Sequence, residues 1–165
     1  DLSLENATVA CALVPIGWAI GCPLLGWIAD KLKRRIPVIV GGALLMILCL
    51  LQIAYLPSLA PVNISLLLMG IGSGAAMIPY SIIKEVNPDK VKGSATGAIN
   101  FLTFGVTTLL APLFSKLYGS KLTSNVDINS LLQYSLLFFV IGITCAIIIT
   151  IFLKETGNLE PEEAK

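Results

Sequence analysis

Few side chains of this sequence could take part in chemistry, and most of them are charged residues gathered in one short run. Asp30 is followed by four bases, and a second acid, Glu85, ends a later apolar stretch. The four bases are Lys31, Lys33, Arg34 and Arg35. An acid at one helix end can form ion pairs and can also meet the positive N-terminus of a neighbouring helix. The run predicts a network of Asp30, Arg34 and Glu85, although a solvated Glu85 beside Lys84 remains an equal alternative.

Catalytic and metal chemistry have no suitable residues in this sequence. His is absent, and the four cysteines lie inside apolar runs without CxxC spacing; they are Cys11, Cys22, Cys49 and Cys145. No serine has a nearby base. We therefore expect no enzyme activity, no metal site and no cofactor. The near balance of 11 Lys and Arg against 10 Asp and Glu also excludes a basic surface that binds nucleic acid.

The elements that must position these charges are membrane helices. The chain has 165 residues, of which 56% are hydrophobic and 13% charged, and its mean hydropathy is +0.88. A helix needs about 20 apolar residues to cross a bilayer, and five such intervals occur between the charged clusters. They are residues 7–29, 36–55, 62–83, 93–115 and 131–153, followed by a polar tail at 154–165. Continuous apolar runs exclude a β-barrel. They also exclude a soluble protein, because its helices would have no polar face for water. The expected fold is an all-α bundle of five transmembrane helices, with Pro57 and Pro61 in the second turn.

The basic residues predict the orientation of the chain. Most of them follow the first, third and fifth spans, whereas only Lys116 and Lys121 lie on the opposite side, which places those three ends on the cytoplasmic side. The N-terminus is therefore expected outside and the C-terminus in the cytoplasm. We expect an integral, multi-pass protein of the cell membrane, either a plasma or an inner membrane.

The run from Gly26 to Arg35, GWIADKLKRR, resembles the signature G-x-x-x-D-[RK]-x-G-[RK]-[RK] of the major facilitator superfamily. The resemblance implies that Asp30, Lys31, Arg34 and Arg35 belong to a gate that locks one conformation, with Gly26 as a position of close approach. Lys33 stands where the family usually has glycine, which leaves the geometry of the turn open. A plain basic loop with an incidental acid is the alternative.

The resemblance extends over the whole chain and implies a fragment, residues 1–165, that contains helices 8 to 12 of such a transporter. The tail KETG is similar to the segment that closes helix 12 in sugar-type members. Helix 7 and the N-terminal half are then partners of the same polypeptide, along with the bilayer and a small-molecule substrate. The implied function is transport of a small solute by alternating access. A membrane sensor or assembly subunit that keeps the fold without transporting is the alternative.

Two pairs of glycines with small-xxx-small spacing lie in the first and fourth spans, Gly17 with Gly21 and Gly93 with Gly97. This spacing lets two membrane helices approach closely. We expect these two pairs to pack at the cytoplasmic gate, or to serve packing alone. In the third span, glycines and Pro79 predict a bend.

Polar side chains within the spans are candidates for a substrate path, because an amide or hydroxyl in hydrocarbon needs a partner or a wet cavity. The candidates are Asn100, Thr103, Tyr80 and Ser81, with Trp18, Gln52 and Gln133 as weaker ones. No Asp, Glu, Lys, Arg or His lies in the middle of a span, so ion coupling is expected elsewhere in the transporter.

Overall fold

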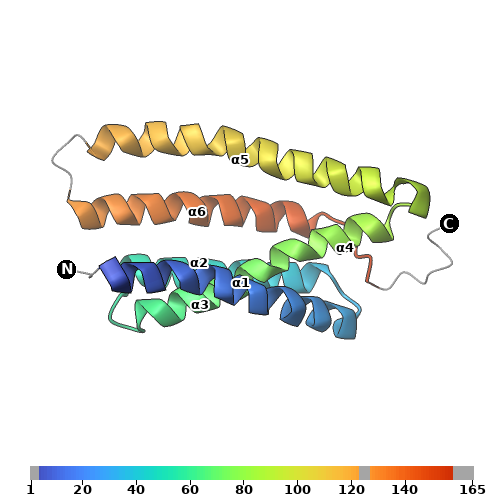
Figure 1. Cartoon of the computed structure of the whole chain (residues 1–165), viewed down its shortest axis with the longest axis horizontal. Coiled ribbons are helices and arrows are strands. Elements are labelled where there is room, and N and C mark those ends of the chain that lie inside the picture. The colour runs from blue at the N-terminus through green and yellow to red at the C-terminus, as the bar shows by residue number, and fades with distance from the viewer. Residues whose placement is uncertain (1–3, 123–126, 158–165) are drawn as a thin grey trace.

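The structure is a computed structural model that describes residues 4–122 and 127–157 (Figure 1). Within these ranges the chain forms helices and no strand, so the protein is all-α. The elements are α1 (Leu4–Leu32), α2 (Ile36–Tyr55), α3 (Val62–Ser73), the 3-10 helix η1 (Gly74–Met77), α4 (Ile78–Glu85), the 3-10 helix η2 (Asp89–Val91), α5 (Lys92–Leu122) and α6 (Ile128–Ile151).

Five segments of the described chain are long and apolar enough to cross a membrane. They are Thr8–Leu32, Ile36–Tyr55, Val62–Glu85, Asp89–Lys116 and Asn129–Ile151. The helices lie side by side along the long axis of the molecule (Figure 1). The protein is therefore an integral, multi-pass membrane protein, as its composition predicts.

The turn between α2 and α3 is closed by side chains that the sequence suggested as weaker substrate contacts. The Gln52 amide donates hydrogen bonds to the carbonyl oxygens of Leu56 (2.9 Å) and Ala60 (3.2 Å) and accepts one from Ser65. The Gln133 amide of α6 donates to the last turn of α2, at the carbonyl of Ala54 (3.1 Å). Both glutamines therefore satisfy backbone groups at the ends of helices.

The closest helix contact is the one between α1 and α3, and it depends on glycine. A Cβ on Gly17 would lie 2.3 Å from the carbonyl oxygen of Leu67, and one on Gly21 would lie 2.2 Å from that of Ile71. Both atoms belong to the backbone of α3, which cannot move aside as a flexible side chain can. Backbones that approach this closely gain packing contacts, which stabilise helix pairs in a bilayer.

The expected pairing of Gly17 and Gly21 with Gly93 and Gly97 is therefore wrong. The first pair packs on α3, and among the described residues no neighbouring heavy atom lies within 4 Å of a Cβ built on Gly93 or Gly97 in α5. Gly26 likewise has open space at its Cβ position, so it is not a position of close approach within the part of the chain that the structure describes. Small-xxx-small spacing identified the close contact in α1 but not its partner helix.

The third span is not one continuous helix. Gly74 starts the 3-10 segment η1, and a Cβ on it would lie 2.3 Å from the backbone carbon of Gly21. Pro79 then stands in the first turn of α4, where its missing N–H costs no hydrogen bond. Because 3-10 segments inside a helix interrupt its regular ladder, α4 can change direction relative to α3.

Helices α5 and α6 bury fewer of their residues inside the described structure than the other three spans do. Helix α6 packs on α2, whereas α5 lies outermost and meets α4 at one end (Figure 1). Phe114 of α5 packs near Phe138 and Phe139 of α6, with ring centroids 5.4 and 5.6 Å apart. Most other apolar side chains of α5 are exposed in the described chain, including Phe101 at 77% and Leu109 at 76%.

Candidate conformational latch

The turn from α1 to α2 depends on a left-handed residue at Lys33. Its φ is 51°, and its N–H donates to the carbonyl of Asp30 (3.2 Å), while the N–H of Arg34 donates to Ala29 (3.2 Å). The superfamily signature has glycine here because glycine adopts this conformation freely. Lysine makes the same turn at a cost of about 1 kcal/mol, so the tight turn is kept.

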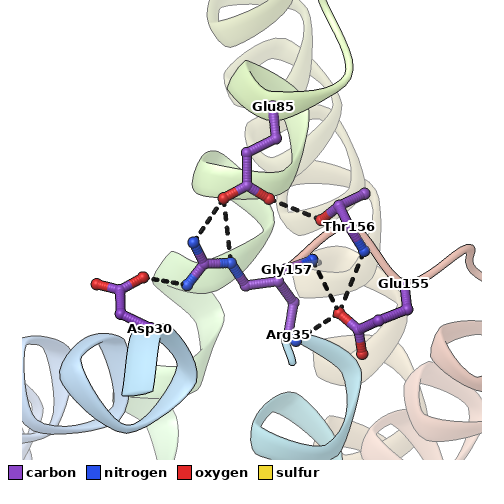
Figure 2. A network of polar contacts seen from close by, with 6 residues as sticks. All are labelled: Asp30, Arg35, Glu85, Glu155, Thr156 and Gly157. Carbon is purple, nitrogen blue, oxygen red and sulfur yellow. Dashed lines mark hydrogen bonds and ion pairs between the residues drawn. The ribbon is translucent and has the colours of Figure 1, made fainter. Parts of the chain in front are cut away.

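Arg35, which directly follows this turn, joins the ends of three helices. Its side chain is 13% exposed, and its Nη1 forms an ion pair with Asp30 at the end of α1. Its Nη2 and Nε donate to the same oxygen of Glu85 at the end of α4, at 2.5 and 3.1 Å (Figure 2). A planar guanidinium can hold several acceptors at once, which a lysine ammonium does with less precise geometry.

Glu155, from the segment that follows α6, binds the N-terminus of α2. Its Oε1 accepts the backbone N–H of Arg35 (2.6 Å), and its Oε2 accepts that of Ile36 (3.2 Å). The N–H groups of Thr156 (3.2 Å) and Gly157 (3.3 Å) also donate to Oε1. The first N–H groups of a helix have no partner within it and carry a partial positive charge, so a carboxylate stabilises them.

Two neighbours of Glu155 complete the contact. Thr156 is 3% exposed, and its hydroxyl donates to the Glu85 oxygen that Arg35 does not use (2.7 Å). A Cβ on Gly157 would lie 2.6 Å from the backbone of Lys33, so this close approach requires glycine. We call the six residues of this network the latch: Asp30, Arg35, Glu85, Glu155, Thr156 and Gly157 (Figure 2).

Two residues of the latch, Arg35 and Glu155, are held in their ionised forms. Burial lowers the pKa of Arg35, but hydrogen bonds and attraction from Glu85 and Asp30 outweigh this effect and raise it. Burial raises the pKa of Glu155, but the four backbone N–H groups outweigh it and hold the value below the usual 4.5. Both side chains are therefore charged at neutral pH.

The depressed pKa of Glu155 predicts how its contribution to stability depends on pH. A carboxyl whose pKa is lower in the folded state stabilises that state above its unfolded value, near 4.5, and stops doing so as pH falls through the folded value. We expect Glu155→Gln to lower the melting temperature at about pH 7, with the gap to the native chain closing as the pH falls below 4.5. Thermal unfolding across this range is the measurement. A gap that stays constant down to acid pH would contradict the assignment.

The structure brings together only some of the residues that the sequence proposed for the gate. Asp30 and Glu85 meet through Arg35 rather than through Arg34, which is exposed and forms no ion pair among the described residues. Lys31 lies with its Nζ 4.9 Å from the ring centroid of Trp27. The acid at the N-terminus of α2 is Glu155 rather than Asp30.

Sequence reasoning missed Glu155, Thr156 and Gly157. The only signal in the sequence is the run KETG, which resembles the segment that closes helix 12 in sugar-type members but reads equally well as part of a polar tail. Contacts across more than 100 positions of sequence, such as the 120 that separate Arg35 from Glu155, leave no spacing pattern to read.

The four candidates for a substrate path lie on α4 and α5. The Tyr80 hydroxyl donates to Oδ1 of Asn100 (2.6 Å), and this bond joins the two helices. The Thr103 hydroxyl donates to the carbonyl of Ile99 in its own helix (2.8 Å), and Ser81 is exposed. One face of α5 carries a polar stripe at helical spacing: Thr96, Asn100, Thr103 and Thr107.

These features define an all-α, multi-pass membrane protein whose helix ends are joined by an interfacial charge network. The family model described as the Major Facilitator Superfamily matches residues 1–165, so the chain belongs to this superfamily of transporters. The expected membership of the superfamily is thereby confirmed. A search of curated proteins and a search of solved structures found no significant match.

Proposed function

We propose that this chain takes part in secondary transport of a small solute by alternating access, and that the latch stabilises one of the alternating conformations. The observation that carries this proposal is the position of Arg35, which connects α1, α4 and, through the Glu155 contact on its own N–H, the segment after α6. A transporter that alternates needs contacts that are made in one state and broken in the other.

The latch adjoins α4, a helix on which its opening and closing would act. Helix α4 is separated from α3 by the irregular segment η1, and Glu85 ties the far end of α4 to Arg35. The bond from Tyr80 to Asn100 couples α4 to α5. We expect α4 and α5 to move together when the pair of Arg35 and Glu85 opens. The surplus of basic residues at this end of the bundle supports its placement on the cytoplasmic side.

The polar stripe of α5 favours the proposal that this helix forms one wall of the substrate cavity. Each threonine hydroxyl of the stripe donates to a carbonyl four positions earlier in α5. The Asn100 amide differs, because its Oδ1 accepts from Tyr80 while its NH2 group has no acceptor among the described residues, so its contact with lipid would be unfavourable. The cavity would be completed by the remaining helices of the transporter. Neutral hydrogen-bonding groups at these positions suit a solute that presents hydroxyl or amide groups to this wall.

The test uses the complete transporter that contains this chain. Asp30→Asn removes the charge that pairs with Arg35, and we expect about threefold slower uptake with unchanged insertion in the membrane. Asp89→Asn is the matched control, because Asp89 is exposed and pairs only with Lys92 among the described residues, three positions along the chain. Normal uptake by fully inserted Asp30→Asn would refute the role of Asp30.

A further inference from the structure

The bases that follow Asp30 divide into two groups. Arg35 is turned into the latch, whereas Lys31, Lys33 and Arg34 are exposed and have no carboxylate partner among the described residues. The latch carboxylates already hold Arg35, backbone N–H groups and the Thr156 hydroxyl. Three cations are therefore concentrated within four positions of a turn between two membrane helices, without a function in the latch.

Lys33 is the least expected of the three. Its φ of 51° is a conformation that glycine adopts without strain and lysine does not. The turn itself therefore gains nothing from a lysine side chain. A residue kept in a strained conformation points to a function of its side chain, which here adds a positive charge at the tip of the turn.

The depth of this cluster in the membrane is indicated by Trp27. Its side chain is 59% exposed, and it lies one helical turn before Lys31, whose ammonium stands over the ring at 4.9 Å. Tryptophan is enriched at the level of the lipid headgroups, where its ring is apolar and its N–H is wet. An ammonium held at this ring is therefore at the depth of the lipid phosphates.

We propose that Lys31, Lys33 and Arg34 form a binding site for the headgroup of an anionic phospholipid, with Trp27 lying against its glycerol and acyl region. Basic clusters next to membrane helices bind anionic lipids by charge attraction, and arginine adds planar contacts to phosphate. Lys84 and Lys154, which are exposed next to latch acids, add to the positive field at this end. This site requires that the turn lies at a membrane surface and is independent of transport.

The test is native mass spectrometry of the purified chain in detergent, titrated with dioleoyl phosphatidylglycerol or dioleoyl phosphatidylcholine. We expect phosphatidylglycerol to bind more tightly, and each of Lys31→Gln, Lys33→Gln and Arg34→Gln to weaken its binding about fivefold. Lys92→Gln is the matched control, because this cation is already paired with Asp89 at 2.6 Å. It should leave phosphatidylglycerol binding unchanged.

Lys33→Gly separates the lipid site from the fold. Glycine relaxes the turn, so the melting temperature should hold or rise while phosphatidylglycerol binding falls about fivefold. Equal binding of the two lipids, or full phosphatidylglycerol binding by the triple variant K31Q/K33Q/R34Q, would overturn the site. If soluble glycerol phosphate at equal concentration displaced the lipid, the site would bind a free phosphate compound rather than a lipid.

Discussion

Arg35→Gln is expected to lower the free energy of unfolding by about 1–3 kcal/mol and to slow uptake by the complete transporter. The substitution leaves the carboxylates of Asp30 and Glu85 without their cation. The Glu85 side chain is only 27% exposed, whereas that of Asp30 is 68% exposed, which places the cost below that of a fully buried pair. Thermal unfolding and uptake are the two measurements.

Arg34→Gln is the matched control for this prediction. Arg34 has the same charge one position earlier, but it is exposed and outside the latch. Its loss should change the free energy of unfolding by less than about 0.5 kcal/mol. A double-mutant cycle of Arg35→Gln with Glu85→Gln should give a coupling of about 1 kcal/mol. Additive effects would mean that the two side chains do not interact.

Gly21→Leu is expected to have the largest effect on folding. A Cβ at this position would meet the α3 backbone at 2.2 Å, so α1 and α3 must separate and lose the contact along their length. Overpacking of a side chain costs about 1–3 kcal/mol, and a clash with backbone lies at or above the upper end. We expect little monodisperse protein in size-exclusion chromatography and a clearly lower melting temperature.

Gly26→Leu tests the same substitution in the same helix at a position with open space. No heavy atom of another described element lies within 4 Å of its Cβ position, so the variant should fold as well as the native chain. Helix propensity alone slightly favours the substitution. Equal damage from both variants would show that glycine matters in α1 for a reason other than its contact with α3.

The expected helices follow from the sequence because the bilayer thickness fixes their length. The second expected span, residues 36–55, has the same bounds as α2 (Ile36–Tyr55). Arg35 sets the start of this helix and Pro57 sets its end. The bend in the third span was expected from Pro79 and its glycines. The structure starts the irregular segment at Gly74, one of these glycines, because this residue meets the α1 backbone.

The partners within the site were less predictable, since they depend on rotation and distance rather than on spacing. Which of two neighbouring arginines enters the latch depends on the left-handed conformation of Lys33, which turns the chain between Asp30 and Arg35. The signature names both bases and does not distinguish them. The contribution of Glu155 depends on where the end of α6 lies relative to α2, which no local pattern encodes.

The role of the latch is tested most directly by a distance between the two helix ends that it joins. Spin labels at Leu32 and Val86, each 55% exposed, are introduced in a variant without the four native cysteines. Pulsed electron paramagnetic resonance then measures the distance between α1 and α4. The native latch predicts one narrow distance distribution, and Arg35→Gln predicts a broader one with a longer component, while Arg34→Gln keeps the native form. Identical distributions in all three proteins would contradict a latch at Arg35.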